Sequence, residues 1–175
     1  MGTGIMGDLV SDGAGSGDRC NHDDDMRLTL KDAGYTGPID GVDRNSAMTD
    51  IAKSKNVYTN VWNTDIGHDK ISFLDDETYD HAVATGCLGR GHIPFTAIPT
   101  LIRTIKKGGY LVFTLAWHHL RFEETTVEAL ENYCRTWDRE GLCHLVSCVQ
   151  APHSSSGDCH VFVLQRGSKH KPETV

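Results

Sequence analysis

Two aspartates and a glycine each follow a short hydrophobic run, where parallel sheets place their ligand-binding groups. Asp43 ends the run PIDGV, Asp65 follows VWNT, and Gly86 follows DHAVAT. A carboxylate at Asp43 can accept both hydroxyls of a nucleotide ribose, Asp65 can reach an adenine amino group, and Gly86 lets a ligand approach the backbone closely. Each residue alone is also compatible with a plain turn, solvated at the aspartates and tight at Gly86, so a binding role depends on whether the fold brings the three together.

Two glycine motifs are candidates for a cofactor loop. Gly2-Thr3-Gly4 stands at the start of the chain, and GAGSG occupies residues 13–17. Such loops normally follow a buried strand. The segment ahead of GAGSG, IMGDLV, has a glycine and an aspartate in its middle and does not read as a strand. We therefore expect GAGSG to belong to a surface loop rather than to a cofactor site.

The elements that must position these residues alternate between strand and helix patterns. The hydrophobic patterns predict strands at residues 37–43, 56–65, 82–85, 110–116, 142–150 and 159–166. They predict helices at residues 26–35, 46–56 with Ser46 as N-cap, 95–109 with Gly108 as stop, and 124–141. This alternation predicts an α/β fold with a parallel sheet, helices on both faces and an antiparallel C-terminal strand pair.

A single domain over residues 1–175 suits the length of the chain. The segment 11–25 differs from the rest, because it is rich in glycine and aspartate and almost free of apolar residues. We expect it to be a flexible insert within that domain.

Charge limits the partners. The chain has 17 Lys and Arg against 24 Asp and Glu, a formal net charge of −7. Binding of nucleic acid through charge requires a basic stripe, and only Arg103, Lys106 and Lys107 cluster. No apolar run approaches the roughly 20 residues of a membrane helix, and the acidic start is no targeting peptide. We expect an intracellular, cytoplasmic protein without a nucleic-acid or membrane partner; its oligomeric state stays open.

Metal and nucleophile motifs are lacking in the sequence. The six cysteines occur singly, without a CxxC pair, and we expect them to be reduced. Cys20 with His22, and His118 with His119, lack the spacing of a zinc or calcium site. No GxSxG or P-loop motif occurs, and nothing singles out a Cys–His nucleophile pair. We expect no metal cofactor.

Taken in order, the motifs resemble those of class I S-adenosylmethionine-dependent methyltransferases, most closely the methyltransferase-like proteins of the Williams–Beuren region type. The resemblance covers Leu28 to about Leu115. It rests on the aspartate that ends the second strand, on YDHAV opening the fourth, on GRGHIP after it, and on a Lys-Lys-Gly-Gly turn before the fifth. Each motif is short, and their common order and spacing carry the resemblance.

The resemblance implies a methyltransferase that uses S-adenosyl-L-methionine and an unidentified methyl acceptor. The cofactor-binding residues it implies are Gly2, Thr3 and Gly4 for the methionine part, Asp43 for the ribose with Arg44 beside it, Met48, Asp65 and Ile66 for the adenine, and Gly86 for the sulfonium side. No catalytic residue is assigned. His92 and His118 follow the fourth and fifth strands, and either could be a base if the acceptor must lose a proton.

In the family, the first strand precedes the glycine loop and lies centrally, between the second and fourth strands. Since GTG matches the end of that loop, and IMGDLV resembles the helix behind it, we expect the first strand to be missing. The sheet would then close its gap, recruit residues 5–10 as a substitute, or be poorly stable.

Two other functions stay open beside the methyltransferase. One is a catalytically inactive, methyltransferase-like remnant that acts as a binding or interaction protein, suggested by the missing strand. The other is a nicotinamide-dependent dehydrogenase with a similar sheet, using Asp43 on the ribose.

Overall fold

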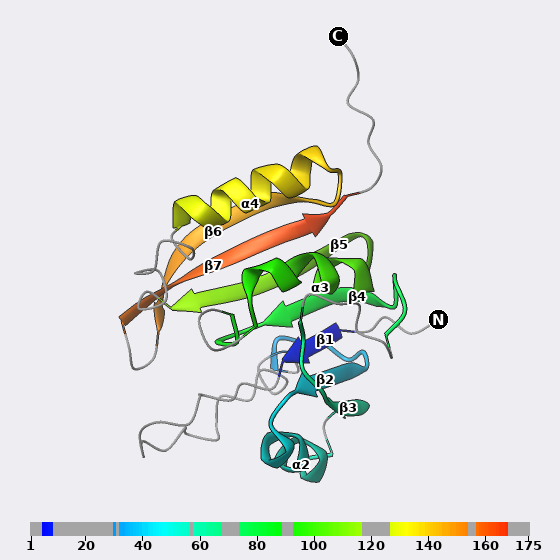
Figure 1. Cartoon of the computed structure of the whole chain (residues 1–175). Coiled ribbons are helices and arrows are strands. Elements are labelled where there is room, and N and C mark those ends of the chain that lie inside the picture. Colours follow the sequence, from blue (N-terminus) through cyan, green and yellow to red (C-terminus); the bar gives the residue numbers. More distant parts are fainter. Residues whose placement is uncertain are drawn as a thin grey trace.

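The computed structural model of the chain describes residues 5–8, 30, 32–56, 58–67, 74–88, 93–116, 127–153 and 157–167. In these residues one seven-stranded sheet runs through the molecule, with the strand order β3-β2-β1-β4-β5-β7-β6 (Figure 1). The strands are β1 (Ile5–Asp8), β2 (Ile39–Asp43), β3 (Asn60–Asn63), β4 (Tyr79–Ala84), β5 (Ile105–Ala116), β6 (Cys143–His153) and β7 (Gly157–Arg166). The helices are α2 (Ser46–Ser54), η1 (Phe95–Ala97), α3 (Ile98–Thr104) and α4 (Val127–Arg139).

Strands β1 to β5 are parallel to one another, whereas β7 pairs antiparallel with both β5 and β6. The α/β class, the parallel sheet and the antiparallel C-terminal strand pair are therefore confirmed. The hairpin of β6 and β7 is longer than the sequence patterns predicted.

The centre of the sheet corrects one expectation. Strand β1 lies between β2 and β4, where we expected a missing strand (Figure 1), and Ile5 pairs with Ile39 on one side and His81 on the other. Residues 5–8 are therefore strand rather than the helical turns suggested by IMGDLV. The physical reason is that β2 and β4 each present backbone donors and acceptors that need partners, which β1 supplies. Of the three outcomes considered for the gap, recruitment of a substitute strand is the one observed.

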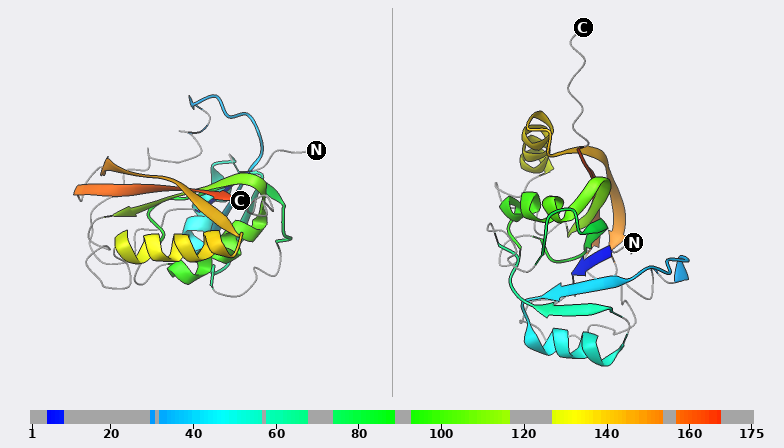
Figure 2. Two further views of the ribbon diagram at one scale, coloured as in Figure 1. Left: turned by 90° about the horizontal axis from the view of Figure 1, so that it is seen from above. Right: turned by 90° about the vertical axis from the view of Figure 1, so that its right-hand side faces the viewer.

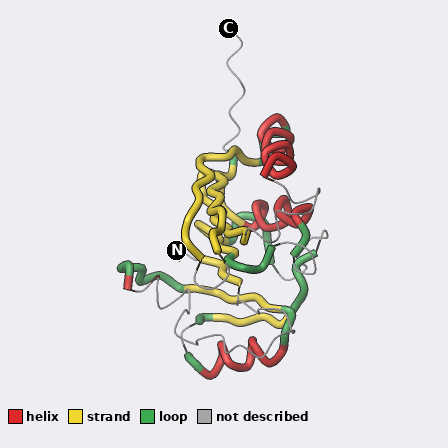
Figure 3. The backbone as a smooth tube through the Cα atoms, turned by 90° about the vertical axis from the view of Figure 1, so that its left-hand side faces the viewer, coloured by secondary structure: helices red, strands yellow, loops and turns green. Residues whose placement is uncertain are grey.

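The core lies mainly between the sheet and the two helices α3 and α4, which cover the same face (Figure 2). On β5 the odd-numbered residues Leu111, Phe113 and Leu115 are fully buried, as expected for a strand with one face against helices. Phe113 stacks on Phe162 of β7, with ring centroids 4.9 Å apart. Helix α2 packs beside β2 and β3 at the opposite end of the sheet (Figure 3).

The boundary between α3 and β5 also differs from expectation. The helix ends at Thr104 and β5 begins at Ile105, so Gly108 is not a helix stop but a residue with φ 81° inside the strand. The pairing with β4 is irregular at this point, because its register shifts between Tyr79, opposite Ile105, and His81, opposite Tyr110. A Cβ on Gly109 would clash with the carbonyl oxygen of Asp80. Gly109, which has no side chain, therefore allows the close approach of β4 and β5 at this point.

Candidate functional site

The carboxyl ends of the parallel strands bring the predicted site residues to one edge of the sheet. Asp43 ends β2, Asp65 and Ile66 follow β3, and Gly86 follows β4. Asp43 pairs with Asn63 in the ladder between β2 and β3, so the segments after these strands start side by side. Ligands of open α/β sheets bind at this edge.

Asp43 is the most constrained residue of this edge. Its side chain is buried, with 3% of the residue exposed, and its Oδ1 accepts a 2.7 Å hydrogen bond from the backbone N–H of Asn45. Its carbonyl oxygen accepts from the N–H of Thr64 at 3.0 Å and from Nδ2 of Asn63 at 3.1 Å. These contacts leave Oδ2 as a buried acceptor without a hydrogen-bond partner.

The environment of Asp43 raises the pKa of its carboxyl above the ordinary value. Burial is the largest cause, and the Asn45 hydrogen bond and the charge of Arg44 oppose it without cancelling it. An unpartnered acceptor in the protein interior costs about 1–3 kcal/mol. A ligand that donates a hydroxyl to Oδ2 would remove that cost, and a ribose supplies such a group.

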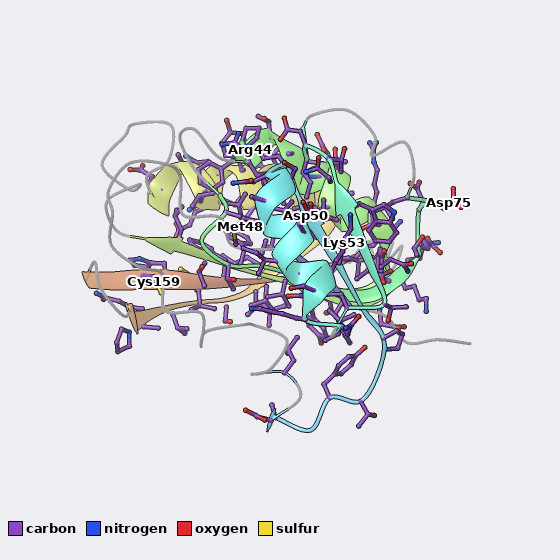
Figure 4. The ribbon with its side chains drawn as sticks, turned by 90° about the horizontal axis from the view of Figure 1, so that it is seen from below. Arg44, Met48, Asp50, Lys53, Asp75 and Cys159 are labelled. Carbon is purple, nitrogen blue, oxygen red and sulfur yellow. The ribbon has the colours of Figure 1, made fainter. Side chains whose placement is uncertain are left out.

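The turn after Asp43 starts helix α2. The N-cap is Asn45, whose Oδ1 accepts from the N–H of Ala47 at 3.0 Å, so the expected cap at Ser46 is wrong by one residue. The reason is that Asn45 has extended backbone geometry, which aims its amide side chain at the first helical turn. Arg44 is exposed at the start of the helix and Met48 is half-buried along it (Figure 4).

Two of the three residues assigned to adenine, Asp65 and Ile66, differ in exposure. Asp65 is exposed, whereas Ile66 is 5% exposed and belongs to the hydrophobic core. Thr64, which precedes them, is tied to the carbonyl of Asp43. The segment that carries Asp65 and Ile66 thus starts beside Asp43, and Ile66 belongs to the core.

Gly86 is held by a residue that sequence patterns did not indicate. It has φ 68°, a conformation that favours glycine, and its N–H donates to Oγ1 of Thr114 at 2.9 Å. Thr114 lies on β5 in the apolar run YLVFTLA. The only sequence signal for a role of Thr114 is a hydroxyl within an apolar run. The sequence does not indicate its partner, because the partner follows from the strand pairing.

His160 is a second residue that sequence patterns did not indicate. It lies on β7 in register with Leu115, one position before the end of β5, and so close to the carboxyl edge. Its Nδ1 is buried without a hydrogen-bond partner, and its ring centroid lies 6.4 Å from that of Phe162. Among the described residues, only His160 Nδ1 and Asp43 Oδ2 are buried side-chain atoms without partners, and both lie at this edge.

The buried thiols are not candidates for a nucleophile. Burial raises the pKa of Cys134 to about 11 and the pKa of Cys143 to about 12, with neighbouring thiols and acidic side chains adding to the effect. Both side chains stay protonated at neutral pH and pack in the core.

Several predicted residues lie outside the described part of the chain. They are Gly2, Thr3, Gly4, His92, His118, and the segment 11–25 with its GAGSG motif. Within the described residues, no group of three or more His, Cys, Asp or Glu side chains could hold a metal ion. None of the helices in the same residues is long and apolar enough to cross a membrane.

The strand order and the ligand edge define a Rossmann-like α/β fold, which solved structures of methyltransferases share. An S-adenosylmethionine-dependent methyltransferase from Methanosarcina mazei is similar over 96% of this chain and 94% of its own, with 16% identity and a TM-score of 0.63. The N-methyltransferase NodS from Bradyrhizobium japonicum, in complex with S-adenosyl-L-homocysteine, is similar over 95% of this chain and 79% of its own, with 19% identity and a TM-score of 0.58. No protein-family model and no curated protein sequence matches the chain. At these identities the comparison establishes the fold.

Proposed function

We propose that this chain is an S-adenosyl-L-methionine-dependent methyltransferase that binds its cofactor at the carboxyl edge of β1 to β4. The observation that carries the proposal is Asp43 Oδ2, a buried and unpartnered acceptor at the end of β2. The fold supports it, because the solved structures with this sheet that are named above are methyltransferases.

The residues of the edge fit the parts of such a cofactor. Asp43 would accept the ribose hydroxyls, with Arg44 beside it, while Met48, Asp65 and Ile66 would border the adenine. Gly86 would lie at the sulfonium side. The sequence resemblance alone assigns Gly2, Thr3 and Gly4 to the methionine part, and their position ahead of β1 in the chain argues against that assignment. The assignment of the other residues places the nucleoside over β2 and β3 and the reactive sulfur toward β4.

The protein's part in the reaction is mainly orientation. When bound, the cofactor would supply a methyl group on a positively charged sulfur, and in-line attack of the acceptor on the methyl carbon would break the carbon–sulfur bond and release S-adenosyl-L-homocysteine. The sheet edge holds the two reactants in the required alignment, which lowers the entropic part of the barrier. The acceptor would approach past the ends of β4 and β5, and His160 is the described polar side chain with an unmet hydrogen-bonding atom on that side.

The alternative of a catalytically inactive, methyltransferase-like remnant is no longer supported by the observation that suggested it. That alternative rested on a missing central strand, and β1 occupies the position between β2 and β4. No feature of the described residues favours a nicotinamide cofactor over S-adenosylmethionine.

Isothermal titration with S-adenosyl-L-homocysteine tests the proposal. Asp43→Asn should weaken binding about 10- to 100-fold, because hydrogen bonds to a charged group contribute about 1.5–3 kcal/mol. Asp50→Asn, an exposed carboxyl on α2, is the matched control and should bind like the unmodified chain. Absence of binding, or binding that Asp43→Asn leaves unchanged, would contradict the proposed cofactor site.

A further inference from the structure

The hydrogen bond between Gly86 and Thr114 connects the end of β4 to the neighbouring strand. Gly86 lies two residues beyond β4, in a left-handed conformation with φ 68°. Its N–H donates to the Thr114 hydroxyl at 2.9 Å. Since the donor of Gly86 is already occupied by Thr114, a ligand at this point can use only the carbonyl oxygen.

Thr114 is itself held in place by the sheet. Strand β5 pairs with β4 on one side and with β7 on the other, and Thr114 is in register with Val161 of β7. Its hydroxyl therefore has a fixed position, and the hydrogen bond to it anchors the turn after β4. Loss of the hydroxyl would free the Gly86 amide to seek another partner, and the turn would move.

Asp43 and Gly86 divide the edge into two parts. Strand β1 separates β2 from β4, so the ends of β2 and β4 lie two strand spacings apart, about 10 Å. An extended cofactor with its ribose on Asp43 would present its sulfur and its amino-acid group near Gly86. A carbonyl oxygen there suits an ammonium group or the positive sulfonium.

We propose that Thr114 is a positioning residue, which fixes the backbone of Gly86 for the methionine half of the cofactor while Asp43 binds the nucleoside half. The inference rests on the proposed function and adds to it a residue, Thr114, that holds the Gly86 backbone in place. Thr114 acts through Gly86 and does not itself contact the reacting atoms.

The experiment compares two probes, S-adenosyl-L-homocysteine and adenosine, by titration calorimetry on the full chain. Thr114→Val keeps the side-chain shape and removes the hydroxyl, and Thr114→Ser keeps the hydroxyl. Thr114→Val should bind S-adenosyl-L-homocysteine about 5- to 30-fold more weakly, as expected when an amide loses its partner, with adenosine affinity unchanged within about twofold. Thr114→Ser should bind both probes like the unmodified chain, and Asp43→Asn should weaken both.

Comparing the affinities for the two probes distinguishes a positioning role of Thr114 from a general structural role. If Thr114→Val weakens both probes equally, weakens neither, or is not rescued by Thr114→Ser, the inference is overturned. Should Thr114→Val fail to fold in a melting experiment, Gly86→Ala replaces it, because the left-handed conformation disfavours alanine; it must show the same selective loss. An unmodified chain that binds neither probe refutes the proposed function itself.

Discussion

At the scale of the residue, the charge state of Asp43 links cofactor binding to pH. Its pKa is raised in the folded chain, chiefly by burial. An acid whose folded pKa lies above its unfolded value stabilises the empty fold at low pH, and this contribution is lost as the pH rises through the folded pKa. Ligand binding follows the opposite direction, because only the carboxylate accepts both ribose hydroxyls.

We therefore expect the affinity for S-adenosyl-L-homocysteine to increase as the pH rises through the titration of Asp43, with protons released on binding. Calorimetry from mildly acidic to neutral pH, in two buffers of different ionisation enthalpy, measures both effects. Asp43→Asn should bind weakly with a flat pH profile. If the affinity of Asp43→Asn still rises with pH, the titrating group is not Asp43.

His160 leads to a prediction about stability. A buried nitrogen without a partner costs free energy, so His160→Leu should raise the free energy of unfolding by about 1 kcal/mol. The matched control is His144→Leu, an exposed histidine on the neighbouring strand β6, which should change stability by less than about 0.5 kcal/mol. Urea unfolding measures both. Destabilisation by His160→Leu would mean that the imidazole is already satisfied in solution.

Some residues of the site could be predicted from local sequence patterns, and others could be found only from the folded structure. Asp43, Asp65 and Gly86 follow hydrophobic runs, and this local pattern placed them at a strand end. Thr114 acquires its role from Gly86, 28 residues away, and His160 acquires its role from the antiparallel pairing of β7 with β5. Neither relation leaves a local trace in the sequence.

At the scale of the element, the short strand β1 is supported by a side-chain bridge between its two neighbours. The hydroxyl of Tyr79, on β4, donates to Oδ2 of Asp40, on β2, at 2.9 Å. Oδ1 of Asp40 also accepts from the backbone N–H and from Nδ2 of Asn60, at the start of β3. Strands β2, β3 and β4 are thus connected beyond the four residues that β1 supplies.

Tyr79→Phe should destabilise the fold by about 1.5–3 kcal/mol, the range for a hydrogen bond to a charged acceptor. Tyr79 is only 2% exposed, and phenylalanine in its place would leave Oδ2 of the half-buried Asp40 without this donor. Thermal or urea unfolding measures the loss. Tyr133→Phe, at an exposed position of α4, is the control and should be nearly neutral. If Tyr79→Phe and Tyr133→Phe are equally stable, the hydrogen bond between Tyr79 and Asp40 does not help to join β2 and β4.

The strand β1 also shows why one element escaped prediction. Its four residues, IMGD, have neither apolar alternation nor a continuous apolar run. Pairing with β2 and β4 makes them a strand, and this depends on residues more than 30 positions away. By contrast, β5 and α4 carry long local patterns, and their existence was predicted correctly even where the start of β5 was not.

At the scale of the whole molecule, the position of β1 in the chain bears on which glycine motif serves the cofactor. In open α/β sheets the glycine loop follows the first strand. Strand β1 ends at Asp8, so Gly2-Thr3-Gly4 precedes it in the sequence and GAGSG, residues 13–17, comes after it. The family resemblance favours the first motif, whereas the strand order favours the second.

Two variants decide between the motifs. Deletion of residues 2–4 removes the first and leaves β1 in place, and Gly15→Val alters the second. From the strand order, we expect the deletion to bind S-adenosyl-L-homocysteine within about threefold of the unmodified chain and Gly15→Val to lose at least about tenfold, since a side chain blocks close approach of backbone to ligand. Calorimetry gives the affinities, and melting temperatures show whether each variant is folded. The reverse result would assign the loop to Gly2-Thr3-Gly4 and would mean that the cofactor is held by a segment ahead of the central strand.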